Sequence, residues 1–133
     1  MIGILYRAAD AIRRRFYAGN HGRVGEDLAH RFLRRKGLTV VARNFRERSG
    51  AGEIDLVAWH GGSLVFVEVK TRASEEYGPP EAAVDAEKRI AVRRTAREYM
   101  RRSGVEWGKT RFDIVSVVLE HPVRIEWLQD AFR

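Results

Sequence analysis

The sequence predicts an α/β protein in which α-helices pack on a β-sheet. The periodicity of its apolar residues indicates, in order, a helix, three strands, a second long helix and two more strands. Two glycines, Gly61 and Gly62, separate two of the strand-like runs and indicate a β-hairpin. A length of 133 residues with 44% hydrophobic residues allows one hydrophobic core and is too short for two ordinary domains.

The first residues of the chain differ in character from the rest. Residues 2–17 carry apolar side chains at helical spacing between arginines, which predicts a short basic amphipathic helix. We expect residues 1–20 to form a basic extension and residues 21–133 a single domain. The extension is expected to pack against the domain or to fray, and contact with a membrane or nucleic acid is the alternative. It lacks the continuous apolar stretch of a signal peptide, and no segment is long enough to span a membrane.

The domain is expected to begin with a helix over residues 22–36. Apolar residues recur there at helical period, and basic residues gather at its end, where the helix dipole is negative. Gly37 is a natural stop for this helix. Residues 38–48 resemble a strand that becomes polar, and they lead into the flexible run 49–52.

The hairpin is expected to join strands over residues 53–60 and 63–71. A two-residue turn pairs His60 with Ser63, and counting outward gives the pairs on one face. These pairs are Trp59–Leu64, Val57–Phe66, Asp55–Glu68 and Glu53–Lys70. Directly opposed residues have Cβ atoms about 4.5 to 5.5 Å apart, so the two opposed carboxylates would be within reach of a single ion.

The remaining elements complete the predicted sheet. A long basic helix is expected over about residues 81–103 and ends at Gly104. Strands are expected over residues 112–119 and 123–127, with a turn at His121-Pro122. No internal repeat or low-complexity tract interrupts this order.

The opposed Asp55 and Glu68 need a compensating charge, because both strands are otherwise rich in apolar residues. A divalent cation is the economical answer, since Mg²⁺ binds through one or two carboxylates and keeps waters that substrate phosphate can replace. Lys70 would lie beside such a water and orient it or stabilise developing negative charge. The alternative is a salt-bridge cluster on a solvated edge, and the apolar neighbours on the same face argue against it.

Four separated motifs resemble known proteins in order and spacing. They are Gly22-Arg23-Val24-Gly25-Glu26-Asp27-Leu28-Ala29, Gly52-Glu53-Ile54-Asp55, Glu68-Val69-Lys70-Thr71-Arg72 and Arg111-Phe112-Asp113. The second and third resemble the PD-(D/E)XK nuclease superfamily, which has the restriction-endonuclease-like fold. All four together resemble the YraN-type family of uncharacterised bacterial proteins, from about residue 20 to the C-terminus. Ile54 stands where a proline often precedes the first aspartate of the superfamily.

The resemblance implies a central mixed β-sheet flanked by α-helices. It implies Asp55 and Glu68 as ligands of Mg²⁺ or Mn²⁺, and Lys70 as the catalytic lysine. Archaeal Holliday-junction resolvases of this superfamily add a helical glutamate, and Glu26 matches that catalytic and metal-binding position; an acid favoured near a helix N-terminus is the alternative reading. The superfamily often has a polar residue on the second long helix near the metal, which makes Lys88 an accessory candidate for binding nucleic acid. Junction resolvases work as dimers, which leaves a homodimer open here.

The net charge of +7 predicts attraction to a polyanion, with nucleic acid, DNA in the first place, ahead of an anionic membrane surface. Arg72 follows the catalytic strand and is expected to contact phosphate, as is part of the arginine-rich second helix. Asp113 is expected to be a structural partner of Arg111. The four histidines show no ligand spacing. The absence of cysteine excludes disulfides and thiolate zinc sites, and a cytoplasmic location fits it.

Two functions remain open at this point. The first is a metal-dependent endonuclease that hydrolyses DNA phosphodiester bonds, including those of branched or recombination intermediates. The second is a nucleic-acid-binding or adaptor module that keeps a nuclease fold without turnover. The small size favours the second, because it leaves no separate domain to recognise a substrate.

Overall fold

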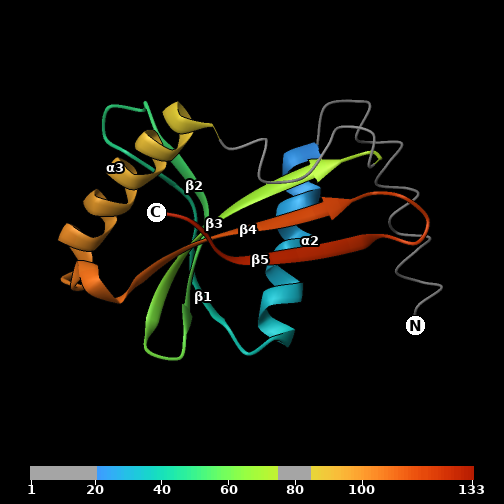
Figure 1. Ribbon diagram of the computed structural model, residues 1–133, viewed down its shortest axis with the longest axis horizontal. Coiled ribbons are helices and arrows are strands. Elements are labelled where there is room, and N and C mark those ends of the chain that lie inside the picture. The colour runs from blue at the N-terminus through green and yellow to red at the C-terminus, as the bar shows by residue number, and fades with distance from the viewer. Residues whose placement is uncertain (1–20, 75–84) are drawn as a thin grey trace.

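The structure, a computed structural model, describes residues 21–74 and 85–133. Its strands form one five-stranded sheet in the order β1-β2-β3-β4-β5 (Figure 1). The elements are α2 (His21–Arg35), β1 (Thr39–Arg46), β2 (Glu53–His60), β3 (Ser63–Arg72), α3 (Ala86–Ser103), a 3-10 helix (Trp107–Lys109), β4 (Thr110–Val118) and β5 (Arg124–Phe132). No helix within these ranges is both long and apolar enough to cross a bilayer.

The sheet is mixed, which confirms the predicted fold class. Neighbouring strands are antiparallel except β3 and β4, which run parallel. A parallel pair needs a crossover connection, and α3 lies within the one that joins β3 to β4. The first turn of α3 contacts β3 through Lys88 and Glu68, and the last turn is followed by the 3-10 helix that leads into β4.

The two helices cover opposite faces of the sheet, and Figure 1 shows α2 passing behind the strands. Strand β3 is buried on both faces, as its apolar run Leu64–Val67 requires. The cluster on the α2 side includes Ala29, Leu33, Leu56, Ala58, Val65, Val67, Val115 and Val117. The cluster on the α3 side includes Val57, Leu64, Phe66, Val92, Ala96, Met100, Phe112 and Ile114.

The helix boundaries agree with the sequence in part. Helix α2 ends at Arg35 and Gly37 follows with a φ of +91°, close to the predicted stop. Helix α3 begins at Ala86, where the Asp85 carboxylate accepts a hydrogen bond from the Lys88 backbone N–H at 2.8 Å. The predicted start of this helix at residue 81, like the predicted helix over residues 2–17, lies outside the described residues.

Strand β5 is longer than predicted, since it continues to Phe132 instead of ending at residue 127. Its pairing with β4 shifts between Phe112 and Ile114, and Asp130 adopts a φ of +51°. The Asp113 carboxylate accepts the Asp130 backbone N–H at 2.9 Å. The buried Asp113 side chain therefore stabilises the register shift between β4 and β5. An alternating sequence pattern does not predict such a shift.

The predicted hairpin register is confirmed near the turn and wrong farther out. His60–Ser63, Trp59–Leu64 and Val57–Phe66 pair as predicted, but the ladder ends at Leu56–Val67. The two outer pairs, Asp55–Glu68 and Glu53–Lys70, are not part of it. Ile54 packs in the α3-side cluster and Leu56 in the α2-side cluster, so the alternation of side chains breaks at Asp55.

Candidate active site

Asp55 lies where β2 and β3 stop pairing. Its Oδ2 accepts the Val69 backbone N–H at 2.8 Å, so the side chain takes the place of a backbone acceptor on the neighbouring strand. Burial and then the nearby Glu68 charge raise the pKa of Asp55 to about 7, although the Val69 hydrogen bond opposes them. A carboxyl with this pKa holds a proton part of the time at neutral pH, and a cation placed beside it would release that proton.

Glu68 is the buried charge at the centre of the site, with a side chain only 5% exposed. Its Oε1 lies 3.2 Å from the Nζ of Lys88 and 3.8 Å from the Nζ of Lys70. Burial alone would lower the pKa of Lys88, but the charge and hydrogen bond of Glu68 outweigh it and raise that pKa. The residues predicted from the second helix and from β3 thus meet at one carboxylate.

Glu26 lies on α2, and burial raises its pKa, opposed by the Arg43 charge. Its Oε1 is buried and has no hydrogen-bond partner among the described residues. Its charge also contributes to the raised pKa of Asp55. The Glu26 Oε1 is therefore an unsatisfied acceptor within electrostatic reach of Asp55.

A close approach of α2 to β3 places Glu26. Gly25 packs against the Thr71 side chain, and a Cβ at position 25 would lie 2.8 Å from the Thr71 Cβ. Glycine is required there because any side chain would push the helix away from the strand. The motifs around Gly25 and around Thr71, far apart in the sequence, are thus in direct contact.

The predicted site residues are brought together to different degrees. Asp55, Glu68, Lys70 and Lys88 lie together by the contacts above. Within residues 21–74 and 85–133, no three acidic or histidine side chains lie close enough together to form a ready metal cluster. The role of Glu26 as a third ligand stays a prediction.

One neighbour of the site, Glu53, differs from its predicted contact, and a second, Arg72, has a backbone contact that was not predicted. Glu53 pairs with Arg46 of β1 at 3.6 Å instead of standing opposite Lys70. Arg72 ends β3 and is partly exposed, and its carbonyl oxygen accepts the Leu119 backbone N–H at 2.8 Å. The outer end of β3 is therefore fixed to the segment that follows β4.

The residues present fit a divalent cation of the magnesium type. Such an ion needs only one or two carboxylates from the protein and fills its other positions with water. Asp55 and Glu68 supply two carboxylates, and the unsatisfied oxygen of Glu26 offers an acceptor for a water of the ion. The competing arrangement is also present, because Lys70 and Lys88 already compensate the charge of Glu68.

Another buried acid, Asp113, is fully covered and its oxygens are hydrogen-bonded. Its two oxygens accept hydrogen bonds from Arg111 at 2.9 Å, and one of them also accepts the Trp127 Nε1 at 2.9 Å. The expected structural pairing of Asp113 with Arg111 is confirmed. Asp113 ties β5 to β4 and is not available for catalysis.

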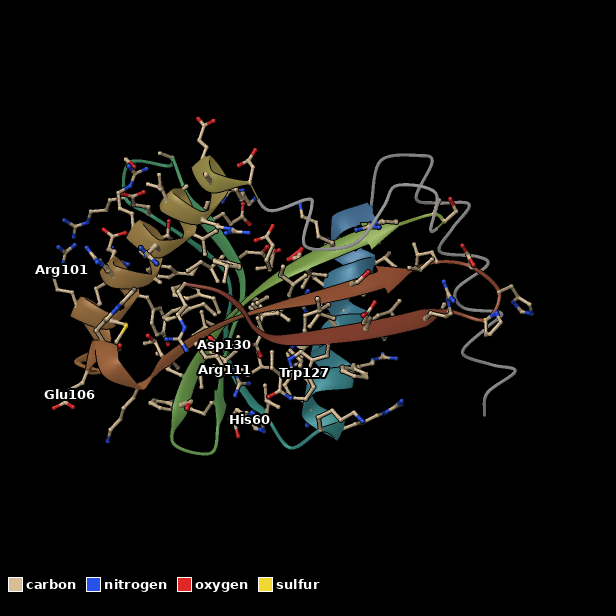
Figure 2. All side chains as sticks on the ribbon, viewed as in Figure 1. His60, Arg101, Glu106, Arg111, Trp127 and Asp130 are labelled. Atoms are coloured by element: carbon tan, nitrogen blue, oxygen red, sulfur yellow. The ribbon has the colours of Figure 1, made fainter. Side chains whose placement is uncertain are left out.

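His60 is not incidental, contrary to the expectation from its spacing. Its Nδ1 lies 2.9 Å from the Nη2 of Arg111, and its ring packs on Trp127 with centroids 5.4 Å apart. Figure 2 shows His60, Arg111 and Trp127 near one another. The spacing of Arg111 and Asp113 in the sequence indicated part of this network. His60 could not be added from spacing, because it comes from β2.

The loop before Asp55 is held by contacts that sequence reasoning missed. Gly52 packs against the Thr95 side chain of α3, where a Cβ would collide with it. The Glu47 carboxylate accepts a hydrogen bond from the Arg94 Nε at 3.1 Å. The buried Glu98 accepts the Arg48 backbone N–H at 3.1 Å. Helix α3 therefore fixes both ends of the loop that delivers Asp55.

Comparison with other proteins identifies the family to which the chain belongs. The profile of the uncharacterised protein family UPF0102 matches residues 25–117. A UPF0102 protein of Solibacter usitatus is 65% identical over 99% of this chain and 100% of its own length. UPF0102 proteins of Koribacter versatilis and Rhodococcus jostii are 50% and 46% identical over 84% of this chain and over 78% and 94% of their own lengths. The chain therefore belongs to the uncharacterised protein family UPF0102, the YraN-type family that its four motifs predict.

Proposed function

We propose that this protein is a Mg²⁺- or Mn²⁺-dependent endonuclease that hydrolyses phosphodiester bonds in DNA. The observation that carries the proposal is the pair of the buried Glu68 and the partly buried Asp55, in which the charge of Glu68 helps to raise the pKa of Asp55 to about 7. A strongly perturbed carboxyl beside a second carboxylate and two lysines is typical of a functional site. A structural salt bridge would not need the second carboxylate.

Asp55 and Glu68 would hold the metal. When bound, such an ion lowers the pKa of a water and stabilises charge on a phosphoryl oxygen. Asp55 would hold the ion as the deprotonated carboxylate, and its hydrogen bond from Val69 keeps it oriented. The buried Glu26 oxygen, which has no partner among the described residues, would accept a hydrogen bond from water in the site.

The lysines have separate roles in the proposal. Lys70, on the same strand as Glu68, orients the attacking water and stabilises the negative charge that develops on phosphate. Lys88 holds the Glu68 carboxylate in place from α3. Arg72 contacts a neighbouring phosphate of the substrate. Branched or recombination intermediates are the substrates that the resemblance to junction resolvases favours.

A non-catalytic nucleic-acid-binding or adaptor module is the second candidate. It is favoured by the two lysine contacts of Glu68, which balance this charge without a metal ion. In that case the basic surface alone would bind DNA. Calorimetric titration with Mn²⁺ separates the two, because the nuclease requires a binding isotherm that Glu68→Gln abolishes.

The test of the nuclease is a cleavage assay with duplex, single-stranded, flap and four-way-junction DNA in the presence of Mg²⁺ or Mn²⁺. We expect cleavage by the natural chain and a loss of about 100-fold or more in Asp55→Asn, Glu68→Gln and Lys70→Met. The matched control is Glu126→Gln, an exposed acid of β5, which should cleave normally. Cleavage of none of these substrates, or undiminished cleavage by Glu68→Gln, would refute the proposal.

A further inference from the structure

A pocket of about 360 Å³ opens at the end of the sheet away from Glu68. The first residues of β3 and β4, the end of β5, α3 and the 3-10 helix contribute to its wall. Two of its lining residues, Arg111 and Asp130, are labelled in Figure 2. Neither Asp55 nor Glu68 lines this pocket, so it is separate from the candidate active site.

The pocket is basic, and one of its arginines lacks a carboxylate. Arg111 is held by the buried Asp113, and Arg133 pairs with Asp130 at 3.0 Å. Arg93 is partly buried, and in the described part of the chain it has no ion-pair partner. A partly buried guanidinium without a counter-charge is costly, which favours an anion in the pocket.

An exposed aromatic ring lies beside this arginine. Trp107 is 38% exposed and is, with Val41 and Ile90, one of three large apolar side chains exposed among the described residues. The Arg97 guanidinium lies over its ring, 5.1 Å from the centroid. A tryptophan face next to guanidinium groups is the combination that binds single-stranded nucleic acid, because bases stack on the ring and phosphates pair with arginine.

A stripe of arginines on α3 connects the pocket with the candidate site. Arg89, Arg93 and Arg97 are four residues apart, so they lie on one face of the helix and span about 12 Å. The Arg89 guanidinium lies over the Phe132 ring at 5.9 Å, next to the end of β5. The stripe begins one residue after Lys88, the partner of Glu68, and ends over Trp107.

We propose that this pocket binds a single-stranded segment of nucleic acid, with a phosphate at Arg93 and a base stacked on Trp107. The ligand class rests on the proposed nuclease function. Ser63, at the pocket, and Glu68 are five residues apart on β3, which is about 17 Å. The pocket would therefore hold the strand at this distance along β3 from the bond at Glu68.

The test measures binding without metal. The full chain is titrated in EDTA with a fluorescent 12-nucleotide oligothymidine, followed by polarisation. We expect Trp107→Ala to weaken binding by about 5- to 100-fold and Trp107→Phe to restore most of it, because a ring is again present for stacking. Arg93→Gln should weaken binding and reduce the slope of log affinity against log salt by about 0.7. Arg34→Gln, an exposed arginine of α2, is the matched control and should stay within about twofold.

Three results would overturn the inference. The first is binding by Trp107→Ala and Arg93→Gln that equals binding by Arg34→Gln. The second is an abasic oligonucleotide of the same length that binds as tightly as oligothymidine, since no base would then be stacked. The third is competition by polyglutamate as effective as that by the oligonucleotide. If Trp107→Ala does not fold, Arg93→Gln and the abasic probe decide.

The outcome is separable from that of the nuclease proposal. A protein that binds through Trp107 and Arg93 but never cleaves supports the pocket and contradicts the nuclease. A protein that cleaves in a Glu68-dependent manner, while Trp107→Ala and Arg93→Gln bind normally, supports the nuclease and contradicts the pocket.

Discussion

Glu68 is a charged residue in an otherwise apolar, buried part of β3. It follows four buried apolar residues of β3 and is itself buried, yet it keeps contacts with two lysines from different elements. Isolated buried charges are costly, and pairing reduces that cost without removing it. A buried charge of this kind is better explained by a function than by a contribution to the stability of the fold.

Asp55 predicts how the stability of the metal-free protein depends on pH. Burial and Glu68 raise its pKa from 3.8 to about 7, so between these values the folded protein binds a proton that the unfolded chain releases. The free energy of unfolding should therefore decrease as the pH rises from about 4 to about 7 through this group. Thermal unfolding in EDTA across this range measures the effect.

Asp55→Asn is the control for this prediction, because it has no carboxyl to titrate. Its unfolding midpoint should fall less with rising pH than that of the natural chain. Glu68→Gln should act in the same direction, since it removes one of the causes of the raised pKa of Asp55. Parallel curves for the natural chain and Asp55→Asn would contradict the assigned pKa.

At the scale of elements, the contact between α2 and β3 depends on Gly25. A Cβ at this position would collide with the Thr71 side chain. Gly25→Ala should lower the free energy of unfolding by about 1 to 3 kcal/mol, as expected of an overpacked contact. Chemical denaturation measures this value.

Gly62→Ala is the matched control for Gly25→Ala. Position 62 has no atoms within 4 Å of an added Cβ, so the substitution should change stability by less than about 0.5 kcal/mol. Equal stability of the two variants would show that α2 does not depend on this close approach.

The strands show what an alternating pattern predicts and where it fails. The glycine turn fixes the pairs from His60–Ser63 to Leu56–Val67, because each step outward repeats the same geometry. The predicted register fails at Asp55, because its side chain, instead of a backbone carbonyl, accepts the Val69 N–H. The two carboxylates are still neighbours, through a different geometry from the predicted one.

Helix α3 was predictable from its apolar period, but its role in the site was only partly so. The contact of Lys88 with Glu68 agrees with its choice as an accessory residue. The Asp85 cap and the contacts of Gly52 with Thr95 depend on tertiary packing, which spacing along the chain does not encode. The pocket around Trp107 was missed for the same reason, since its residues come from five elements.

For the whole molecule, the net charge of +7 predicts salt-sensitive binding to DNA. Each phosphate contact contributes a slope of about −0.9 for duplex DNA in a plot of log affinity against log salt. We expect a slope that corresponds to several contacts. Titration of a labelled duplex at increasing salt concentrations measures it, and an affinity independent of salt would contradict a phosphate-binding surface.

The fold and the family were predictable because the order of elements and the four motifs extend along most of the chain. What the sequence could not settle is which cation balances Glu68, since lysines and a divalent ion satisfy the same charge. The two cases differ in function, because only the metal supplies an activated water.

The most direct test is a crystal structure of the protein soaked with Mn²⁺, with anomalous diffraction to locate the ion. The account predicts one peak bonded to carboxylate oxygens of both Asp55 and Glu68, which disappears in Glu68→Gln crystals. No peak between these carboxylates, with Lys88 still paired to Glu68, would contradict the central claim.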